Sequence, residues 1–275
     1  MSLYPSLLGG GDQMNLIDDA VNTIYRTYGD KVSLNDKGKS LLKFGRNPSV
    51  GTTRCTIWYT GQDELNETYV ADNVNSIDTI SSSSASDTEI VKVEGHTMSG
   101  NNLTFVVQTA TLNGQNKVTL STPLNRITRI AHNDDSATNL VGEIYGYEDT
   151  AISGGKPTDT SKIHITVPAG HNQSQKASTS ISSTDYWIVS EVTAGYIQKS
   201  GSNIAELQVE VRSVGGVFKP ATAPISIKTG DSKEIIFEPY IIIPKNSDVR
   251  LTVEASAGSQ NISGEVNGFL AKIIG

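Results

Sequence analysis

Gly38-Lys39-Ser40 is the stretch of the chain that comes nearest to a phosphate-binding loop. Such a loop holds phosphate oxygens with backbone amides and a lysine, and it needs a further glycine five positions before the second one. Ser33 stands at that position, and Tyr28-Gly29-Asp30-Lys31 does not have the pattern of the buried strand that must come before the loop. The sequence therefore does not predict a nucleotide site.

The histidines and one acidic run offer metal chemistry. The four histidines are His96, His132, His164 and His171. No two of them have the close spacing of metal ligands on one element, so we expect exposed residues with no special role. His132-Asn133-Asp134-Asp135 gathers the oxygen ligands that Ca²⁺ prefers, although a polar run of this kind is typical of a turn.

Acid–base and nucleophilic catalysis have no clear candidates. Asp185, Glu191 and Glu210 lie on or beside expected strands, but a catalytic carboxylate pair is defined by its distance in space. No Gly-x-Ser-x-Gly elbow marks a nucleophile. Aromatic residues are 6% of the chain, which is low for a sugar groove, so we expect Trp58 and Trp187 in the core. The sequence predicts a protein that is not an enzyme and has no cofactor or metal.

Composition indicates which elements must carry these side chains. The 275 residues include 31 Ser, 27 Thr and 25 Gly, with 36% hydrophobic residues. That mixture favours β-structure with many turns. No apolar run approaches the ~20 residues of a membrane-spanning helix. A net charge of −7 argues against nucleic-acid binding, and a single cysteine, Cys55, excludes a disulfide within the chain. The N-terminus lacks the basic region of a secretory signal.

The N-terminal region combines an arm, a helix and a basic segment. Residues 1–12 are expected to form a flexible arm, and apolar residues at helical spacing predict a helix over 13–28 that ends at Gly29. The helix either packs on the β-core or docks on a neighbouring subunit. Residues 26–54 hold seven Lys or Arg against two Asp. They form either a solvated face or an arm on an acidic partner. The candidate anchoring residues are Ile17, Val21, Ile24, Lys39, Lys43, Phe44, Arg46 and Arg54.

Short β-runs separated by turns follow from about residue 55. Asn113-Gly114 is expected to join residues 103–109 and 117–120 in a tight hairpin. Residues 205–211 alternate apolar and polar side chains, which predicts a strand exposed on one face. Pro239 belongs at a sheet edge or corner. Residues 150–161, with Gly154-Gly155, are the expected linker.

These patterns predict a mostly β protein. We expect two β-sandwich or jelly-roll-like domains, preceded by an N-terminal arm with one α-helix. The expected divisions are 1–54 for the arm, helix and basic anchoring segment, 55–155 for the first β-domain and 156–275 for the second.

Several segments, taken in order, resemble virion structural proteins of tailed bacteriophages, particularly those of marine and cyanobacterial phages. They include residues 43–53 followed by Ile57-Trp58, residues 77–88, Thr111-Leu112-Asn113-Gly114, Arg126-Ile127-Thr128-Arg129, residues 165–170, Gly215-Gly216-Val217-Phe218 and residues 243–251. The resemblance covers about residues 40–275.

This resemblance implies a non-enzymatic particle component with no catalytic residues to transfer. The first expectation is a capsid-associated decoration, cement or head-fibre protein that grips the shell through residues 1–54. The resemblance also implies a location in the virion for this protein, with assembly in the host cytoplasm. Its partners are other virion proteins, the major capsid protein first, and further copies of itself; nucleic acid and membrane are not expected. The alternatives are a tail, neck or fibre component and, in another class, a module that binds or cleaves host glycans.

Overall fold

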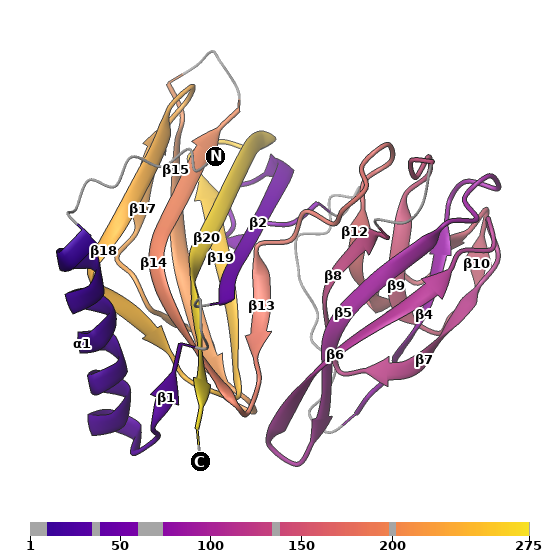
Figure 1. Ribbon diagram of the computed structural model, residues 1–275. Helices are drawn as coiled ribbons and strands as arrows, with labels where there is room; N and C mark the ends of the chain where they lie inside the picture. Colours follow the sequence, from indigo (N-terminus) through magenta and orange to yellow (C-terminus); the bar gives the residue numbers. More distant parts are fainter. Residues whose placement is uncertain (1–9, 35–38, 60–73, 134–137, 198–201, 275) are drawn as a thin grey trace.

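The computed structural model describes residues 10–34, 39–59, 74–133, 138–197 and 202–274. Antiparallel strands make up most of these residues, and the one α-helix among them, α1 (Gly10–Tyr28), lies near the N-terminus. Figure 1 shows two β-sandwiches side by side, with α1 against one of them. The predicted mostly β fold class is confirmed. Within this part of the chain no helix is long and apolar enough to cross a membrane.

One sandwich, which we call the terminal sandwich, takes strands from both ends of the chain. Its first sheet has the order β1-β20-β14-β18, with β2 also paired to β20. Its second has the order β13-β19-β15-β16, with β17 paired to β15 and β3 to β19. The bounds are β1 (Val32–Ser33), β2 (Lys39–Val50), β3 (Cys55–Thr56), β13 (Ser178–Ile181), β14 (Asp185–Tyr196), β15 (Ile204–Ser213), β16 (Lys219–Pro220), β17 (Ile225–Lys228), β18 (Ser232–Ile243), β19 (Ser247–Ala255) and β20 (Gln260–Ile273). Side chains from both sheets, such as Val192, Leu207 and Leu251, form one apolar core.

The other sandwich, which we call the inserted sandwich, comes from the middle of the chain. Its sheets have the orders β12-β9-β4-β7 and β6-β5-β8. The bounds are β4 (Ile77–Ser82), β5 (Ile90–Ser99), β6 (Asn102–Thr111), β7 (Val118–Leu124), β8 (Arg126–His132), β9 (Ile144–Glu148), β10 (Ile152–Ser153), β11 (Lys156–Pro157), the 3₁₀ turn η1 (Thr160–Lys162) and β12 (Ile163–Val167). Ile80, Val93 and Ile130 lie in a second apolar core that is separate from the first.

Helix α1 packs on the terminal sandwich. Ala20 and Ile24 are buried against Tyr186 and Ile188 of β14, in a small apolar cluster. Gly29 ends the helix, because its φ of +74° suits glycine and its amide donates to the carbonyl of Tyr25 at 2.9 Å. The helix predicted over 13–28 is therefore confirmed, and it packs on the β-core of its own chain.

The strand pairing divides the chain differently from the ranges 1–54, 55–155 and 156–275. Residues 39–50, predicted as part of an anchoring segment, form β2 and pair with β20. Residues 163–167 form β12 and pair with β9 of the inserted sandwich. The expected linker around Gly154-Gly155 is instead the turn between β10 and β11. A Cβ at Gly155 would lie 1.7 Å from the carbonyl oxygen of Ser82, so this turn is packed tightly against β4. That the two sandwiches are independent domains stays a prediction.

Two local predictions were partly wrong. Gly114 has the positive φ expected of an Asn-Gly turn, but β6 and β7 on either side of it belong to different sheets. The turn therefore crosses between layers. On β15 the predicted wet face is largely covered, because Gln208 and Glu210 are buried beside neighbouring strands and Glu206 and Arg212 are half-buried. An alternating sequence shows which side chains of a strand are polar, but it does not show which neighbouring segments cover them.

Other predictions from the pattern hold. Trp58 and Trp187 are buried in the core. Pro239 lies in β18, which is the end strand of its sheet, where a missing amide donor removes no ladder hydrogen bond.

Candidate functional site

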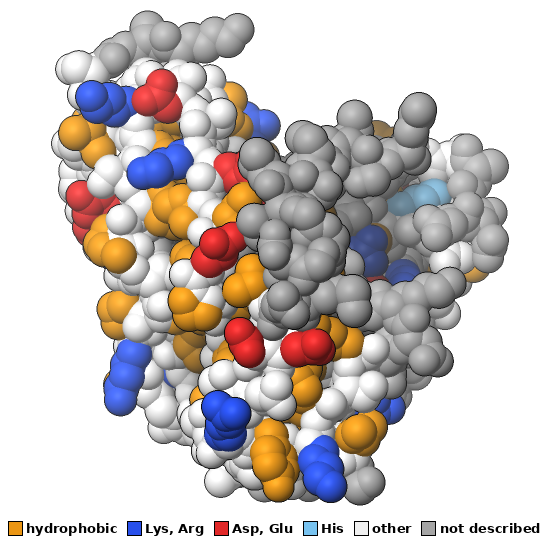
Figure 2. Space-filling model, turned by 60° about the vertical axis from the view of Figure 1, so that its left-hand side comes forward, with side chains coloured by type: hydrophobic (Ala, Val, Ile, Leu, Met, Phe, Trp, Pro, Cys, Tyr) orange, Lys and Arg blue, Asp and Glu red, His pale blue; other side chains and the backbone are white. Residues whose placement is uncertain are grey.

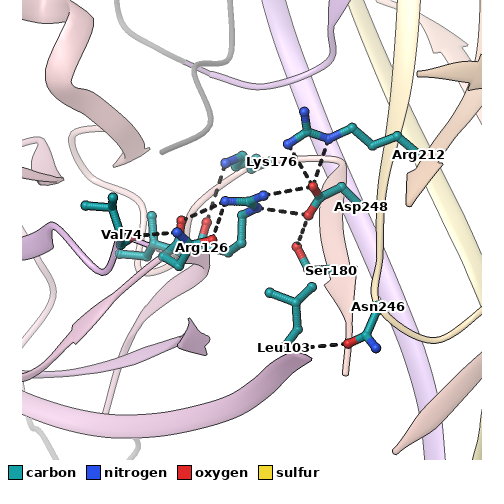
Figure 3. Close-up of polar contacts among 10 residues, drawn as sticks. Val74, Leu103, Arg126, Lys176, Ser180, Arg212, Asn246 and Asp248 are labelled. Atoms are coloured by element: carbon teal, nitrogen blue, oxygen red, sulfur yellow. Dashed lines mark hydrogen bonds and ion pairs between the residues drawn. The ribbon is translucent and has the colours of Figure 1, made fainter. Parts of the chain in front are cut away.

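Three charged residues meet at the boundary between the two sandwiches. Arg126 of β8 in the inserted sandwich donates from Nε and Nη2 to Oδ1 and Oδ2 of Asp248 in β19, at 3.0 and 3.1 Å. Arg212 of β15 donates to Asp248 Oδ2 at 2.8 Å from another side. Ser180 Oγ donates to Oδ1 at 2.6 Å. Figure 3 shows the two guanidinium groups converging on this one carboxylate.

Burial makes this cluster a strong link. Asp248 is fully buried and Arg126 is 3% exposed, so neither charge has water as an alternative partner. Burial alone would raise the pKa of Asp248, but the charges and hydrogen bonds of Arg126, Arg212 and Ser180 outweigh it and hold that pKa below its ordinary value. The carboxylate is therefore ionised and fixes the inserted sandwich to the terminal sandwich.

Further contacts cross the boundary beside this cluster. Asn246, in the turn before β19, accepts a hydrogen bond through Oδ1 from the amide of Leu103 at 2.9 Å (Figure 3). The amide of Ser183 donates to the carbonyl of Leu103 at 2.9 Å. Lys176 Nζ donates to the carbonyl of His164 at 2.9 Å. Directional bonds at several points thus fix one orientation of the two sandwiches.

A cleft of about 620 Å³ lies next to this boundary. One wall is the outer face of β5, β6 and β8, with Glu94, Phe105 and Arg129 among its side chains; the other comes from β2, β13 and β20. Its volume falls within the range of ligand pockets, ~300–1,000 Å³. We therefore treat this cleft as the candidate binding site.

Two buried ionisable groups line the cleft. Burial lowers the pKa of Lys43 to about 8, and its amine reaches one acceptor at 3.4 Å, the carbonyl of Thr128. Burial also lowers the pKa of His96 to about 3, which keeps the imidazole neutral. Its Nδ1 has no hydrogen-bond partner among the described residues. Glu94, in contrast, is bound by Lys92 at 3.0 Å and by Arg129 at 2.9 Å.

The residues predicted to anchor a partner are dispersed in the structure. Ile24 and Lys43 are buried, Ile17 and Val21 are half-buried on α1, and Phe44 lines the cleft. Arg46 Nε donates to Asn261 Oδ1 at 3.0 Å. Arg54 pairs with Glu254 at 2.9 Å. The side chain of Lys39 lies outside those that the structure describes. Contact of this set with a partner stays a prediction.

Of the four histidines predicted to be exposed, two are buried and His132 is half-buried. His96 and His164 are 2% and 3% exposed, and His164 Nε2 lies 3.0 Å from Glu148 Oε1. The expectation was wrong because β12, which carries His164, is covered on both faces. His171 Nδ1 lies 3.2 Å from Gln175 Nε2.

The other chemical candidates remain apart. Glu210 pairs with Arg250 at 2.8 Å, and Glu191 accepts from Thr193 at 3.0 Å. Asp185, which lines the cleft, accepts from Thr184 at 2.9 Å. Asp134 and Asp135, and Gly38 of the phosphate-loop match, lie outside the described residues. Among the described residues no three His, Cys, Asp or Glu side chains are grouped as metal ligands would be.

Sequence reasoning did not find the Arg126–Asp248 link or the cleft. The segments that hold the link, Arg126-Ile127-Thr128-Arg129 and residues 243–251, were noted for β-runs and for their resemblance, and neither signal pairs one with the other. Two arginines inside a β-run were a usable signal, because buried arginine needs a partner carboxylate.

Comparison with known proteins found matches among solved structures. No protein-family model matches the chain, and no curated protein does. A crystal structure of the T13 particle of infectious bursal disease virus is 11% identical, with 96% of this chain and 77% of that chain covered and a TM-score of 0.25. The VP2 subviral particle of the same virus is 12% identical over 93% of this chain and 78% of that chain, with a TM-score of 0.25. These neighbours are viral capsid proteins, but the TM-score is too low for the likeness to carry an argument about this chain.

Proposed function

We propose that the chain is a non-enzymatic structural protein of a tailed-phage virion, and more specifically a capsid-associated decoration, cement or head-fibre protein. The observation that carries the proposal is the buried network of Arg126, Asp248 and Arg212. These charged groups hold the two β-sandwiches in one orientation, and a fixed shape suits a component of an assembled particle. The order of the sequence motifs that resemble phage virion proteins supports the virion assignment.

Attachment to the shell is assigned to the N-terminal region. Helix α1 turns Ala20 and Ile24 inward and leaves Tyr25 and Tyr28 exposed at 53% and 44%, with Arg26 exposed between them. Figure 2 turns this side of the molecule forward, and hydrophobic side chains there are interleaved with acidic and basic ones. Tyr and Arg are enriched in protein–protein interfaces, so the exposed Tyr25, Arg26 and Tyr28 support a contact through α1.

Localisation on purified particles tests the assignment. Gold-labelled antibody against the chain is expected to mark the icosahedral faces of the head in electron micrographs. Label at one vertex or along the tail would replace the capsid assignment with a neck, tail or fibre role. Absence of the chain from particles would overturn the virion assignment altogether.

Attachment through α1 is tested by co-sedimentation with capsids stripped of the protein. The variant Tyr25→Ser/Arg26→Gln changes two exposed side chains of α1, and we expect at least tenfold weaker binding. Val217→Ser/Lys219→Gln is the matched control, since it also removes one exposed apolar group and one exposed charge, away from α1. Equal loss in both variants, or no loss in either, contradicts attachment through α1.

A further inference from the structure

The cleft between the sandwiches has a charge opposite to that of the whole chain. Its cationic side chains are Lys43, Lys92, Arg129 and Lys272, against the anionic Glu94 and Asp185. The chain as a whole has a net charge of −7. A local excess of positive charge in an acidic protein favours an anionic occupant.

Two buried groups that line the cleft, Lys43 and His96, lack strong partners among the described residues. The Lys43 amine is 8% exposed and has its one described acceptor at 3.4 Å, which is long for a charged hydrogen bond. The His96 imidazole is 2% exposed, and its Nδ1 is without a hydrogen-bond partner in the described structure. Buried polar groups are normally satisfied, so such positions point to a ligand that supplies the missing contacts.

The walls of the cleft also carry exposed apolar side chains. Phe105 and Val107 are 43% and 49% exposed at alternate positions of β6, and Leu42 of β2 is 45% exposed on the other side. Residues two apart on a strand share one face, so Phe105 and Val107 present a continuous apolar surface. An occupant must therefore contribute apolar groups as well as negative charge.

We propose that this cleft binds an extended acidic segment of a partner protein, with carboxylates toward Lys43 and Lys272 and apolar side chains against Phe105 and Val107. An extended peptide turns successive side chains to opposite sides, so one segment can direct carboxylates to the wall of β2 and β20 and apolar side chains to the wall that carries Phe105 and Val107. The inference rests on the proposed function only for the origin of the segment, which is another virion protein.

Fluorescence anisotropy with synthetic peptides and the full chain tests the proposal. The probe is a fluorescein-labelled peptide of eight residues that alternates Asp and Leu. The control peptides alternate Lys with Leu and Asp with Ser. We expect the Asp/Leu peptide to bind at least tenfold more tightly than either control, and its binding to weaken as sodium chloride is raised, because charged contacts are screened.

Variants with matched controls locate the binding. Phe105→Ser/Val107→Ser and Lys92→Gln/Lys272→Gln are each expected to weaken binding of the Asp/Leu peptide at least tenfold. The controls, Val141→Ser/Val217→Ser and Lys219→Gln/Lys228→Gln, change exposed side chains outside the cleft and are expected to bind as the unchanged protein does. If Phe105→Ser/Val107→Ser does not fold, as judged by its thermal unfolding, Lys92→Gln/Lys272→Gln tests the proposal. This second variant is expected to fold, because Lys272 is exposed and Lys92 is half-exposed.

Several outcomes overturn the proposal. They are equal affinity for the Lys/Leu peptide, unchanged affinity in both cleft variants, and full displacement of the peptide by millimolar inorganic phosphate, which would mark a small-anion site. Failure of the proposed virion function is recognised separately, because it appears as absence of the chain from particles while the peptide result is unaffected.

Discussion

The interior of each sandwich and the boundary between the sandwiches are built from different interactions. Between the facing sheets the contacts are apolar, as with Leu207 and Leu251 in the terminal sandwich and Ile80 in the inserted one. Between the sandwiches they are directional and charged, with Asp248 bound by Arg126 and Arg212. Hydrophobic contact has no preferred direction, whereas a bidentate ion pair fixes an orientation. The sheets of each sandwich are therefore held together by apolar burial, and the relative orientation of the two sandwiches is fixed by charge.

Removing the carboxylate of Asp248 is expected to cause the largest loss of stability. Asp248→Ala leaves the buried Arg126 without its counter-charge, and we expect a loss of about 3–5 kcal/mol in the free energy of unfolding. Urea unfolding followed by circular dichroism measures it. We also expect separate transitions for the two sandwiches in this variant. A loss below about 1 kcal/mol would contradict a structural role for the link.

A cavity in the core of the terminal sandwich tests the apolar contacts separately from the charged link. Leu251→Ala removes a fully buried side chain from the terminal core, and we expect a cost of about 2–5 kcal/mol from lost burial and the cavity left behind. Urea unfolding of this variant is expected to remain a single transition, because the charged link is intact. Two separated transitions here would mean that the core, rather than Asp248, couples the sandwiches.

The boundary should respond to alkaline pH through Lys43. The pKa of this amine is lowered to about 8 by burial, so the folded state binds fewer protons than the unfolded state, and stability rises with pH between about 8 and 10. The gain attributable to Lys43 is on the order of 2 kcal/mol. Urea unfolding at pH 8 and pH 10 gives the free energy of unfolding of the unchanged protein and of Lys43→Met. The gain from Lys43 is the difference between the two proteins in how much this free energy rises from pH 8 to pH 10. Parallel pH dependence in the two proteins would contradict it.

An exposed pair should show the smallest effect. Arg54 and Glu254 pair at 2.9 Å with side chains 25% and 39% exposed, and such pairs contribute about 0–1 kcal/mol because water competes for both charges. Glu254→Gln is therefore expected to shift the urea midpoint only slightly. A loss of stability as large as that expected for Asp248→Ala would show that burial does not determine how much an ion pair contributes to stability.

Local patterns allowed much of the fold to be predicted. Apolar residues at helical spacing located α1, and Gly29 marked its end. Trp58 and Trp187 were assigned to the core because large aromatic side chains are favoured there. Pro239 was assigned to an edge because it cannot donate a ladder hydrogen bond. Each of these features is decided within a few residues of chain.

The sequence by itself determined the β class, the helix and the positions of many turns, because these depend on local polarity and backbone preference. The tertiary structure alone decided that β2 joins β20, that His164 is buried, and that Arg126 meets Asp248 across 122 residues of chain. Strand pairing and buried charge pairs join residues far apart in sequence, and nothing in the spacing of one strand specifies its partner. The cleft with Lys43 and His96 exists for the same reason, since its walls come from segments that only folding brings together.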